Sequence, residues 1–295
     1  MSASLIILIP FVLLGLVTAL CFVGCGLPVT GLPDDLGPYQ NTITKHPNLI
    51  ALWPLNDTRD PNAPPQTALA VGPPLTAFNG TYVGGFMLTQ AGIVPGDVLP
   101  GSAIPTPCAS FTGGRVQVPF HSELNPDATF TVEAWVKPNW GAGPPMAQNA
   151  VVVSANADPK INAGYGLIAT PDNFWEANLG LGLSDPSAFL VTKFDKQIVT
   201  NVASYLALTF DGTMLTLFVG PVGGVVTSRS TPLPVNSKYQ PELQATATQL
   251  FIAMGSPDAG ANPFNGSIQD VAFYSPALNS ADVQLHFALG SKPPG

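Results

Sequence analysis

Apolar side chains occupy every second position over several short stretches of this chain. In residues 129–137 (Thr-Phe-Thr-Val-Glu-Ala-Trp-Val-Lys) the Phe, Val, Ala and Val side chains share one face, and Glu133 and Trp135 share the other. A period of two is typical of a β-strand with one buried face. The pattern therefore predicts a strand that carries Glu133 and Trp135 on its outward face.

A second pair of alternating stretches predicts a β-hairpin. Residues 205–210 and 214–219 flank an Asp-Gly sequence, which favours a tight turn between two strands. The same alternation places Tyr205 and Phe218 on the outward faces of these strands.

Two further strands are predicted at residues 250–254 and 267–274, and one helix at residues 279–288. Asn279 suits the N-cap of this helix, and Gly290 suits its end. Many short strands with a single helix are typical of an antiparallel β-sandwich. The predicted fold class of the body is therefore all-β.

Five blocks of sequence, in order, resemble the laminin-G-like, concanavalin A-like jelly-roll domains of bacterial surface proteins. The blocks are 49–57 (LIALWPLND), 79–85 (NGTYVGG), 109–119 together with 124–126 and 130–138, 206–219, and 264–278. The first block looks like the opening strand of these domains, and the second like the small loop that follows it. The resemblance implies a concanavalin A-like jelly roll over residues 47–289, but a fold does not decide function.

Calcium is the commonest ligand of the domains that this sequence resembles, so the resemblance implies Ca²⁺ as a candidate cofactor. Such hard cations take six to eight oxygen ligands. Asp57, Asp60 and Asp258 stand in predicted loops where a site could form, although loop aspartates more often cap turns. Gln269 stands where these domains usually carry Asp, which weakens a transfer of ligand binding.

The N-terminal stretch predicts a membrane segment, because residues 5–27 carry no charged side chain. About twenty apolar residues in a helix span a bilayer core of about 30 Å, so residues 1–27 are predicted to form one transmembrane helix. A proline in an early turn would bend this helix, and small residues would let another helix approach closely. The positions singled out are Leu5, Pro10, Gly15, Leu20 and Cys25.

Two alternatives to a retained helix stay open. A cleaved signal peptide normally begins with basic residues, and residues 1–4 contain none. A lipoprotein signal needs a small residue before a cysteine, and cleavage after Gly24 would leave Cys25 as a lipidated N-terminus. With a retained helix, the acidic C-terminal domain would lie outside the inner (cytoplasmic) membrane, in the periplasm or the extracellular space.

Residues 28–46 are predicted to be an extended linker, because three prolines and two glycines disfavour a helix. The β-sandwich then covers residues 47–289, and residues 290–295 form a polar tail.

Composition narrows the function classes. Only 9% of the residues are charged, whereas an average soluble domain has about 25%. The ten basic residues are scattered and outnumbered, with a net charge of −8, so a nucleic-acid-binding surface is not expected. A hydrophobic content of 46% excludes disorder. A surface this poor in charge favours a domain that is part of an assembly.

Catalysis is not predicted. A retaining glycosidase needs two carboxyl groups about 5–5.5 Å apart, and none of the four glutamates has an acidic neighbour two positions away. Asp172 and Glu176 are four positions apart, in a stretch that resembles a loop. No Gly-x-Ser-x-Gly sequence accompanies the three histidines.

The outward aromatic side chains form a candidate binding surface. Aromatic residues are enriched in protein interfaces, and their rings also form platforms for sugars; alternatively, a second layer packs on them and makes them core residues. The candidates for partner or ligand binding are Trp135, Glu133, Tyr205, Phe218, Trp140 and Trp175.

The sequence therefore predicts a non-catalytic, single-span accessory subunit that docks on the integral membrane proteins of a larger complex, of photosynthetic or respiratory type for example. The alternative is a carbohydrate-binding surface lipoprotein or adhesin, whose partner would be a polysaccharide. No nucleic-acid partner is expected.

Overall fold

The computed structural model describes residues 36–58, 66–72, 78–99, 101–140, 149–155, 162–182, 189–241, 250–255 and 263–292. The chain divides into two units, Met1–Leu32 and Pro33–Gly295, and every described residue belongs to the second. The predicted transmembrane helix, with Leu5, Pro10, Gly15, Leu20 and Cys25, lies outside the described residues. Over the described ranges, no helix is long and apolar enough to cross a membrane.

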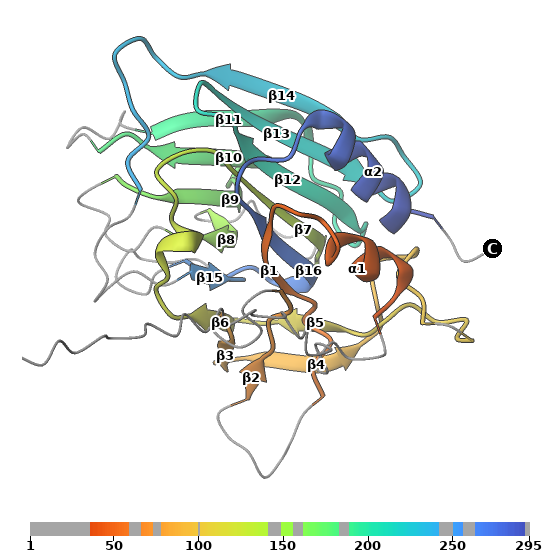
Figure 1. The fold of residues 1–295 in the computed structure, drawn as a ribbon. Coiled ribbons are helices and arrows are strands. Elements are labelled where there is room, and N and C mark those ends of the chain that lie inside the picture. Colours follow the sequence, from red (N-terminus) through yellow and green to blue (C-terminus); the bar gives the residue numbers. More distant parts are fainter. Residues whose placement is uncertain are drawn as a thin grey trace, which may run out of the picture. The chain divides into compact units, whose positions relative to one another are not determined.

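Two antiparallel sheets face each other in a β-sandwich, as predicted (Figure 1). In sheet A the strand order is β14 (Thr227–Pro232), β13 (Met214–Pro221), β12 (Ser204–Phe210), β7 (Phe130–Pro138), β16 (Gly266–Tyr274), β5 (Cys108–Phe111) and β4 (Phe86–Gln90), and β1 (Leu49–Trp53) also pairs with β16. In sheet B the order is β11 (Phe189–Gln197), β10 (Phe174–Gly180), β9 (Tyr165–Ala169), β8 (Ala150–Ser154), β15 (Leu250–Ile252), β6 (Arg115–Val118), β3 (Gly80–Val83) and β2 (Thr67–Ala68). The helices are α1 (Pro38–Ile43), η1 (Ser122–Leu124, a 3₁₀ turn) and α2 (Ser280–Gly290).

The strands predicted from alternation are confirmed. β7 occupies the first alternating stretch, and β12 and β13 form the predicted hairpin around Asp211 and Gly212. The carboxylate Oδ1 of Asp211 accepts hydrogen bonds from the backbone N–H groups of Thr213 and Met214, both 2.8 Å, and Gly212 has φ +94°. Residues 79–85, expected to be a small loop, contain strand β3 instead.

The inner faces of the two sheets form the main hydrophobic core. Phe130 of β7 stacks on Phe273 of β16 with ring centroids 5.7 Å apart, and Tyr165 of β9 meets both rings from the opposite sheet. All three side chains are buried. Burial of such aromatic side chains supplies much of the stability of a sandwich.

Helices α1 and α2 cover the outer face of sheet A and create a second hydrophobic core there (Figure 1). Tyr39 and Ile43 of α1 and Val283 and Phe287 of α2 pack against Trp135 of β7 and its neighbours. Sheet A is therefore buried on both faces in this region.

The structure corrects the predicted linker, because residues 38–43 form α1. Pro38 is the first residue of this helix, where the missing N–H of proline costs no intrahelical hydrogen bond. Tyr39, Gln40 and Ile43 are buried, so α1 is part of the folded body. The body therefore begins before residue 47.

The predicted C-terminal helix is confirmed as α2. Asn279 is its N-cap, and its side-chain Oδ1 accepts hydrogen bonds from the N–H groups of Ala281 (2.8 Å) and Asp282 (3.0 Å). Gly290 is the last helical residue, and a Cβ atom there would lie 2.4 Å from Cζ2 of Trp135. Glycine therefore allows the end of α2 to approach the indole ring.

Candidate functional site

The aromatic side chains predicted to point outward do so, but the chain itself covers them. Trp135, Tyr205 and Phe218 belong to the second core, on the face of sheet A opposite to the main core. The ring of Trp135 lies 5.3 Å from that of Tyr205 and 6.0 Å from that of Phe287 in α2. Trp135 and Tyr205 are 0% exposed and Phe218 is 6% exposed. The predicted binding surface is thus corrected to a buried layer, because two helices lie on it.

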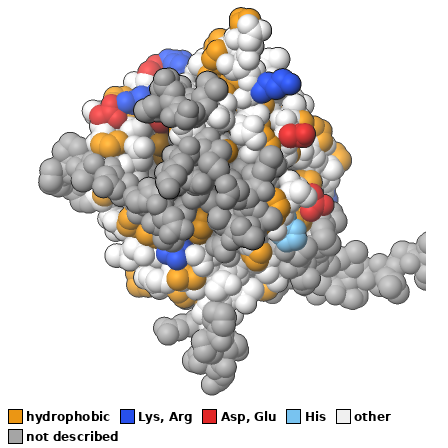
Figure 2. Space-filling model, turned by 90° about the vertical axis from the view of Figure 1, so that its left-hand side faces the viewer, with side chains coloured by type: hydrophobic (Ala, Val, Ile, Leu, Met, Phe, Trp, Pro, Cys, Tyr) orange, Lys and Arg blue, Asp and Glu red, His pale blue; other side chains and the backbone are white. Residues whose placement is uncertain are grey.

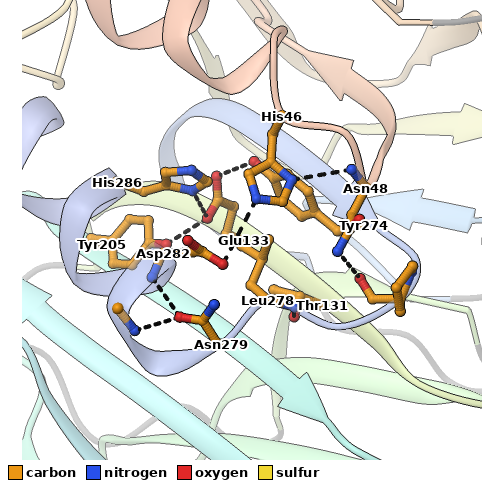
Figure 3. Close-up of polar contacts among 12 residues, drawn as sticks. His46, Asn48, Thr131, Glu133, Tyr205, Tyr274, Leu278, Asn279, Asp282 and His286 are labelled. Carbon is orange, nitrogen blue, oxygen red and sulfur yellow. Dashed lines mark hydrogen bonds and ion pairs between the residues drawn. The ribbon is translucent and has the colours of Figure 1, made fainter.

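Glu133, the other candidate on this face, is held at the centre of a buried polar cluster (Figure 3). Its Oε2 accepts a hydrogen bond from the Tyr205 hydroxyl (2.5 Å), and its Oε1 accepts one from the Tyr274 hydroxyl (2.7 Å). Nδ1 of His286 lies 3.0 Å from Oε2. The carboxylate from β7 therefore links two strands of sheet A to α2.

Glu133 and His286 shift each other's pKa. Burial alone would raise the pKa of Glu133, but the His286 charge and the bonds from His286 and the two tyrosines outweigh burial and hold the pKa below its ordinary value of 4.5. Burial alone would lower the pKa of His286, but Glu133 raises it above its ordinary value of 6.5. The two side chains therefore form an ion pair over a shared pH range.

This ion pair has a structural role. The exposed fractions of the His286 and Glu133 side chains are 2% and 0%, so a substrate has no access to either. The ring of His46, which follows α1, lies 5.8 Å from the His286 ring and 5.5 Å from the Tyr274 ring. The cluster therefore fixes both helices on sheet A.

A second buried polar network was not predicted from the sequence. The side-chain amide of Gln40 donates to Oδ1 of Asp270 (2.7 Å), and the backbone N–H of Gln40 donates to Oδ1 of Asp97 (3.4 Å). Thr106 donates its hydroxyl to Oδ2 of Asp97 (2.5 Å) and accepts a bond from the Gln269 amide (2.8 Å). The network ties α1 to β16 and to the segment between β4 and β5.

Burial raises the pKa of Asp270 well above its ordinary value of 3.8, and Asp97 raises it further; burial likewise raises the pKa of Asp97. Oδ2 of Asp270 and Oε1 of Gln40 are buried without a hydrogen-bond partner among the described residues. A protonated Asp270 suits this environment, because it carries a donor and no charge. Asp270 also has φ +54° at a bulge in β16, a conformation that Asp and Asn adopt more readily than most residues.

Neither Trp140 nor Trp175 forms an exposed platform. Trp175 of β10 is 2% exposed and belongs to the main core. Trp140 is half-buried; its Nε1 donates to Oδ1 of Asn173 (3.3 Å), and its ring meets the Phe264 ring edge-on at 5.5 Å. Both rings mainly pack against other side chains of the domain, and only part of the Trp140 side chain is exposed to solvent.

The calcium candidates fall on different parts of the chain. Asp60 and Asp258 lie outside the described residues. Asp57 accepts a hydrogen bond from the Leu69 N–H on Oδ1 (3.2 Å) and from the Tyr82 hydroxyl on Oδ2 (2.8 Å). Both oxygens thus serve as hydrogen-bond acceptors that join Asp57 to Leu69 and Tyr82. Within the described ranges, no three His, Cys, Asp or Glu side chains are placed to hold a metal ion.

The outer face of sheet B carries half-buried polar side chains in a pattern suited to ligand contact. On β10, Phe174, Glu176 and Asn178 alternate with the buried Trp175 and Ala177. The sequence analysis placed residues 172–176 in a loop, although the alternation from Phe174 to Asn178 was a signal for a strand. This stretch is instead strand β10 with the turn before it.

Charges on β11 complete this face. Lys193 lies opposite Glu176 in the register of β10 and β11, and its Nζ is 4.8 Å from the centroid of the Phe174 ring. Lys193 also forms an exposed ion pair with Asp172, and its hydrogen bond lowers the pKa of Asp172. Burial raises the pKa of Glu176. We refer to Asp172, Phe174, Glu176, Asn178 and Lys193 as the β10 face.

The β10 face offers one ring, two carboxyl groups, one amide and one ammonium group on two neighbouring strands and the turn before β10. Since Lys193 pairs with Asp172, the arrangement resembles a polar recognition surface more than an acid–base pair. Figure 2 shows that charged side chains of the described residues are few on the side of the molecule that it presents, and that acidic and basic ones lie beside each other at its upper left.

Comparisons with known proteins agree with this architecture. Residues 111–284 match a laminin G family model described as "Concanavalin A-like lectin/glucanases superfamily". Domain 4 of AbnA, an extracellular arabinanase from Geobacillus stearothermophilus solved with arabinotriose, superimposes with a TM-score of 0.51 at 17% identity, covering 82% of this chain and 98% of that one. The binding domain of botulinum neurotoxin serotype D gives a TM-score of 0.50 at 12% identity, covering 85% of this chain and 52% of that one. No curated protein matches the chain at a significant level.

Proposed function

Because this chain belongs to the concanavalin A-like lectin/glucanases superfamily, we propose that it is a non-catalytic binding module whose ligand is a carbohydrate. The β10 face is the observation that carries this proposal. A fold by itself leaves function open, and the arabinanase domain, which was solved with arabinotriose, supports the choice of ligand class only by analogy.

The chemistry of the β10 face suits a sugar. The Phe174 ring provides an apolar surface for the C–H groups of a sugar ring, and Glu176 and Asn178 lie two positions apart along the same side of β10. Their carboxylate and amide groups can accept from and donate to sugar hydroxyls. Lys193 supplies a further donor opposite Glu176.

The positions of the carboxyl groups argue against hydrolysis. Glu133 is sealed beneath α2, and Asp97 and Asp270 are buried in the network that holds α1. The β10 face carries both Asp172 and Glu176, but the Asp172 carboxylate is paired with Lys193 and is not free to act together with Glu176. A glycosidase needs an acid and a partner carboxylate on either side of one bond, and no such pair is formed by these residues.

A glycan array probed with the full chain in mild detergent tests the proposal. We expect binding to one class of glycan and no release of reducing sugar from it. Glu176→Gln and Phe174→Ala should each weaken binding about tenfold, whereas Glu123→Gln, an exposed change on η1, should not. Hydrolysis of the bound glycan, or binding that is unaffected by both face variants, would contradict the proposal.

A second candidate function rests on the N-terminal stretch. Residues 5–27 are uncharged, and only 9% of the residues of the whole chain are charged. Both observations support a single-span subunit whose domain docks on integral membrane proteins at the outer side of the inner membrane. Two results would favour this function: stoichiometric co-purification with other membrane proteins in mild detergent, and an intact mass that corresponds to a chain starting at Met1. A mass that begins at a lipidated Cys25 would favour the surface lipoprotein instead.

A further inference from the structure

A row of hydroxyl groups crosses the outer face of sheet A beside α2. Thr131 of β7 lies opposite Thr209 of β12, Thr209 lies opposite Thr216 of β13, and Thr216 lies opposite Ser230 of β14. Directly opposite residues of neighbouring strands point to the same face and are about 5 Å apart. Four strands therefore present four hydroxyls in a line across the strand direction.

The other three members of this hydroxyl row have partners, but Thr209 has none among the described residues. Oγ1 of Thr131 accepts a hydrogen bond from the Leu278 N–H (2.9 Å), and the Thr216 and Ser230 hydroxyls bond each other at 2.8 Å. The Thr209 side chain is only 8% exposed, and no described residue bonds its hydroxyl. Thr209 also lines a pocket, so its hydroxyl is free to bond water or a ligand there.

A pocket of about 420 Å³ opens above the row. Thr209 and Thr216 line it from the sheet, together with Phe218, and the segment between β16 and α2 lines the other side. Figure 1 shows this segment passing over the outer side of sheet A on its way to α2. Ligand pockets have volumes of about 300–1,000 Å³, so this pocket can take one or two sugar rings.

The lining selects a neutral ligand. Asp211 is its one charged side chain; Oδ1 accepts from the Thr213 hydroxyl and from two backbone N–H groups, and no described donor bonds Oδ2. A single carboxylate repels anions. It also supplies too few oxygen ligands for a hard cation, which takes six to eight. The N–H groups of Ala281 and Asp282 at the start of α2 already donate to the Asn279 side chain, so they are not available to an anion.

We propose that this pocket, with Thr209 and Thr216 of the hydroxyl row as its floor, is a second binding site that takes a neutral sugar unit. Hydroxyls of Thr209 and Thr216 and the free oxygen of Asp211 would bond the sugar hydroxyls, and Phe218 and Leu278 would contact its apolar face. The proposal shares the ligand class of the proposed function but uses the opposite sheet, so the two can fail separately.

Methyl NMR of threonine in the full chain tests the pocket directly. Titration with neutral glucose, galactose or arabinose should shift the Thr209 and Thr216 methyl signals, whereas glucuronate should not, because Asp211 repels it. Thr209→Val keeps the shape of the side chain and should weaken binding of the neutral sugar about tenfold without lowering the melting temperature. Thr227→Val, on β14 and outside the pocket lining, is the matched control.

The outcomes separate the two sites. Loss of binding in Thr209→Val but not in Glu176→Gln supports the pocket. Unchanged binding in both Thr209→Val and Thr216→Val, with loss in Glu176→Gln, overturns the pocket and leaves the β10 face standing. Equal shifts by glucuronate and neutral sugars overturn the neutral-ligand assignment, and no binding of any sugar overturns both proposals.

Discussion

His286 of α2 and Glu133 of β7 form a buried ion pair, with Nδ1 and Oε2 3.0 Å apart, between the C-terminal helix and the centre of sheet A. The chain separates these residues by 153 positions. The hydroxyls of Tyr205 in β12 and Tyr274 in β16 hold the same carboxylate, and His286 joins α2 to it.

Glu133→Gln should destabilise the protein by about 3 kcal/mol, because it removes the charge that three buried donors share and leaves them poorly bonded. The free energy of unfolding in urea measures this change. Glu123→Gln, an exposed glutamate-to-glutamine change, should stay within about 0.5 kcal/mol of the wild type. If the two variants changed the free energy of unfolding equally, Glu133 would not be the residue that attaches α2 to sheet A.

The same pair gives stability a defined pH dependence. The folded pKa of Glu133 is lowered, so its contribution is present above pH 4.5 and is lost as the pH falls below that value. The folded pKa of His286 is raised, so its contribution is present below pH 6.5 and is lost as the pH rises through the folded pKa. Both contributions are therefore complete between pH 4.5 and 6.5.

Unfolding free energies from pH 4 to 9 check this window. His286→Gln should reduce the decline of the unfolding free energy above pH 6.5. Asp97 and Asp270 also favour low pH, because their folded pKa values are raised. The His286 contribution is therefore the difference in unfolding free energy between Asp270→Asn and Asp270→Asn/His286→Gln, in which the Asp97 contribution cancels. A decline that persists unchanged in the double variant would contradict the assignment.

Asp270→Asn should stabilise the protein at neutral pH, with a gain that grows as the pH rises. The asparagine amide removes a buried acid whose Oδ2 has no described partner, keeps the acceptor for Gln40, and tolerates φ +54°. We expect a gain of about 1–3 kcal/mol at pH 7. Asp270→Ala, which removes the acceptor, should destabilise at every pH; thermal unfolding of both variants distinguishes the effects.

Ile43→Ala should cost about 2–5 kcal/mol, because Ile43 of α1 is fully buried in the second core. A residue in an extended linker would show almost no effect. Asn41→Ala, on the exposed side of the same helix, is the matched control, and urea unfolding of both compares them. A cost below about 0.5 kcal/mol for Ile43→Ala would restore the linker interpretation.

Alternation predicted the strands and the facing of their side chains, but it could not show what packs on each face. A period of two places Trp135 opposite to Val132 and Val136, and the structure agrees. Whether Trp135 meets solvent or a helix depends on α2, which joins the sheet through contacts 153 residues apart in the chain. Sequence patterns of one strand contain no information on such a partner.

Other features were hidden for local reasons. Pro38 resembled a helix breaker, although proline at the first helical position favours a start. The network of Gln40, Asp97 and Asp270 joins segments 57 and 230 positions apart, and none of the three residues forms a motif with its chain neighbours. The β10 face had a signal in its alternation, which nearby prolines and turn residues obscured.

The two ends of the folded body meet at one place. The Gly290 carbonyl at the end of α2 accepts a hydrogen bond from the N–H of Gly96 (2.8 Å), and Asp97, the next residue, accepts one from Gln40 near the start of α1. Domains with adjacent ends tolerate circular permutation and insertion into other proteins. A permutant opened at Gly212 and closed by a short connection between α2 and α1 should therefore fold, and the module could be grafted into a surface loop of a host without spreading that loop apart.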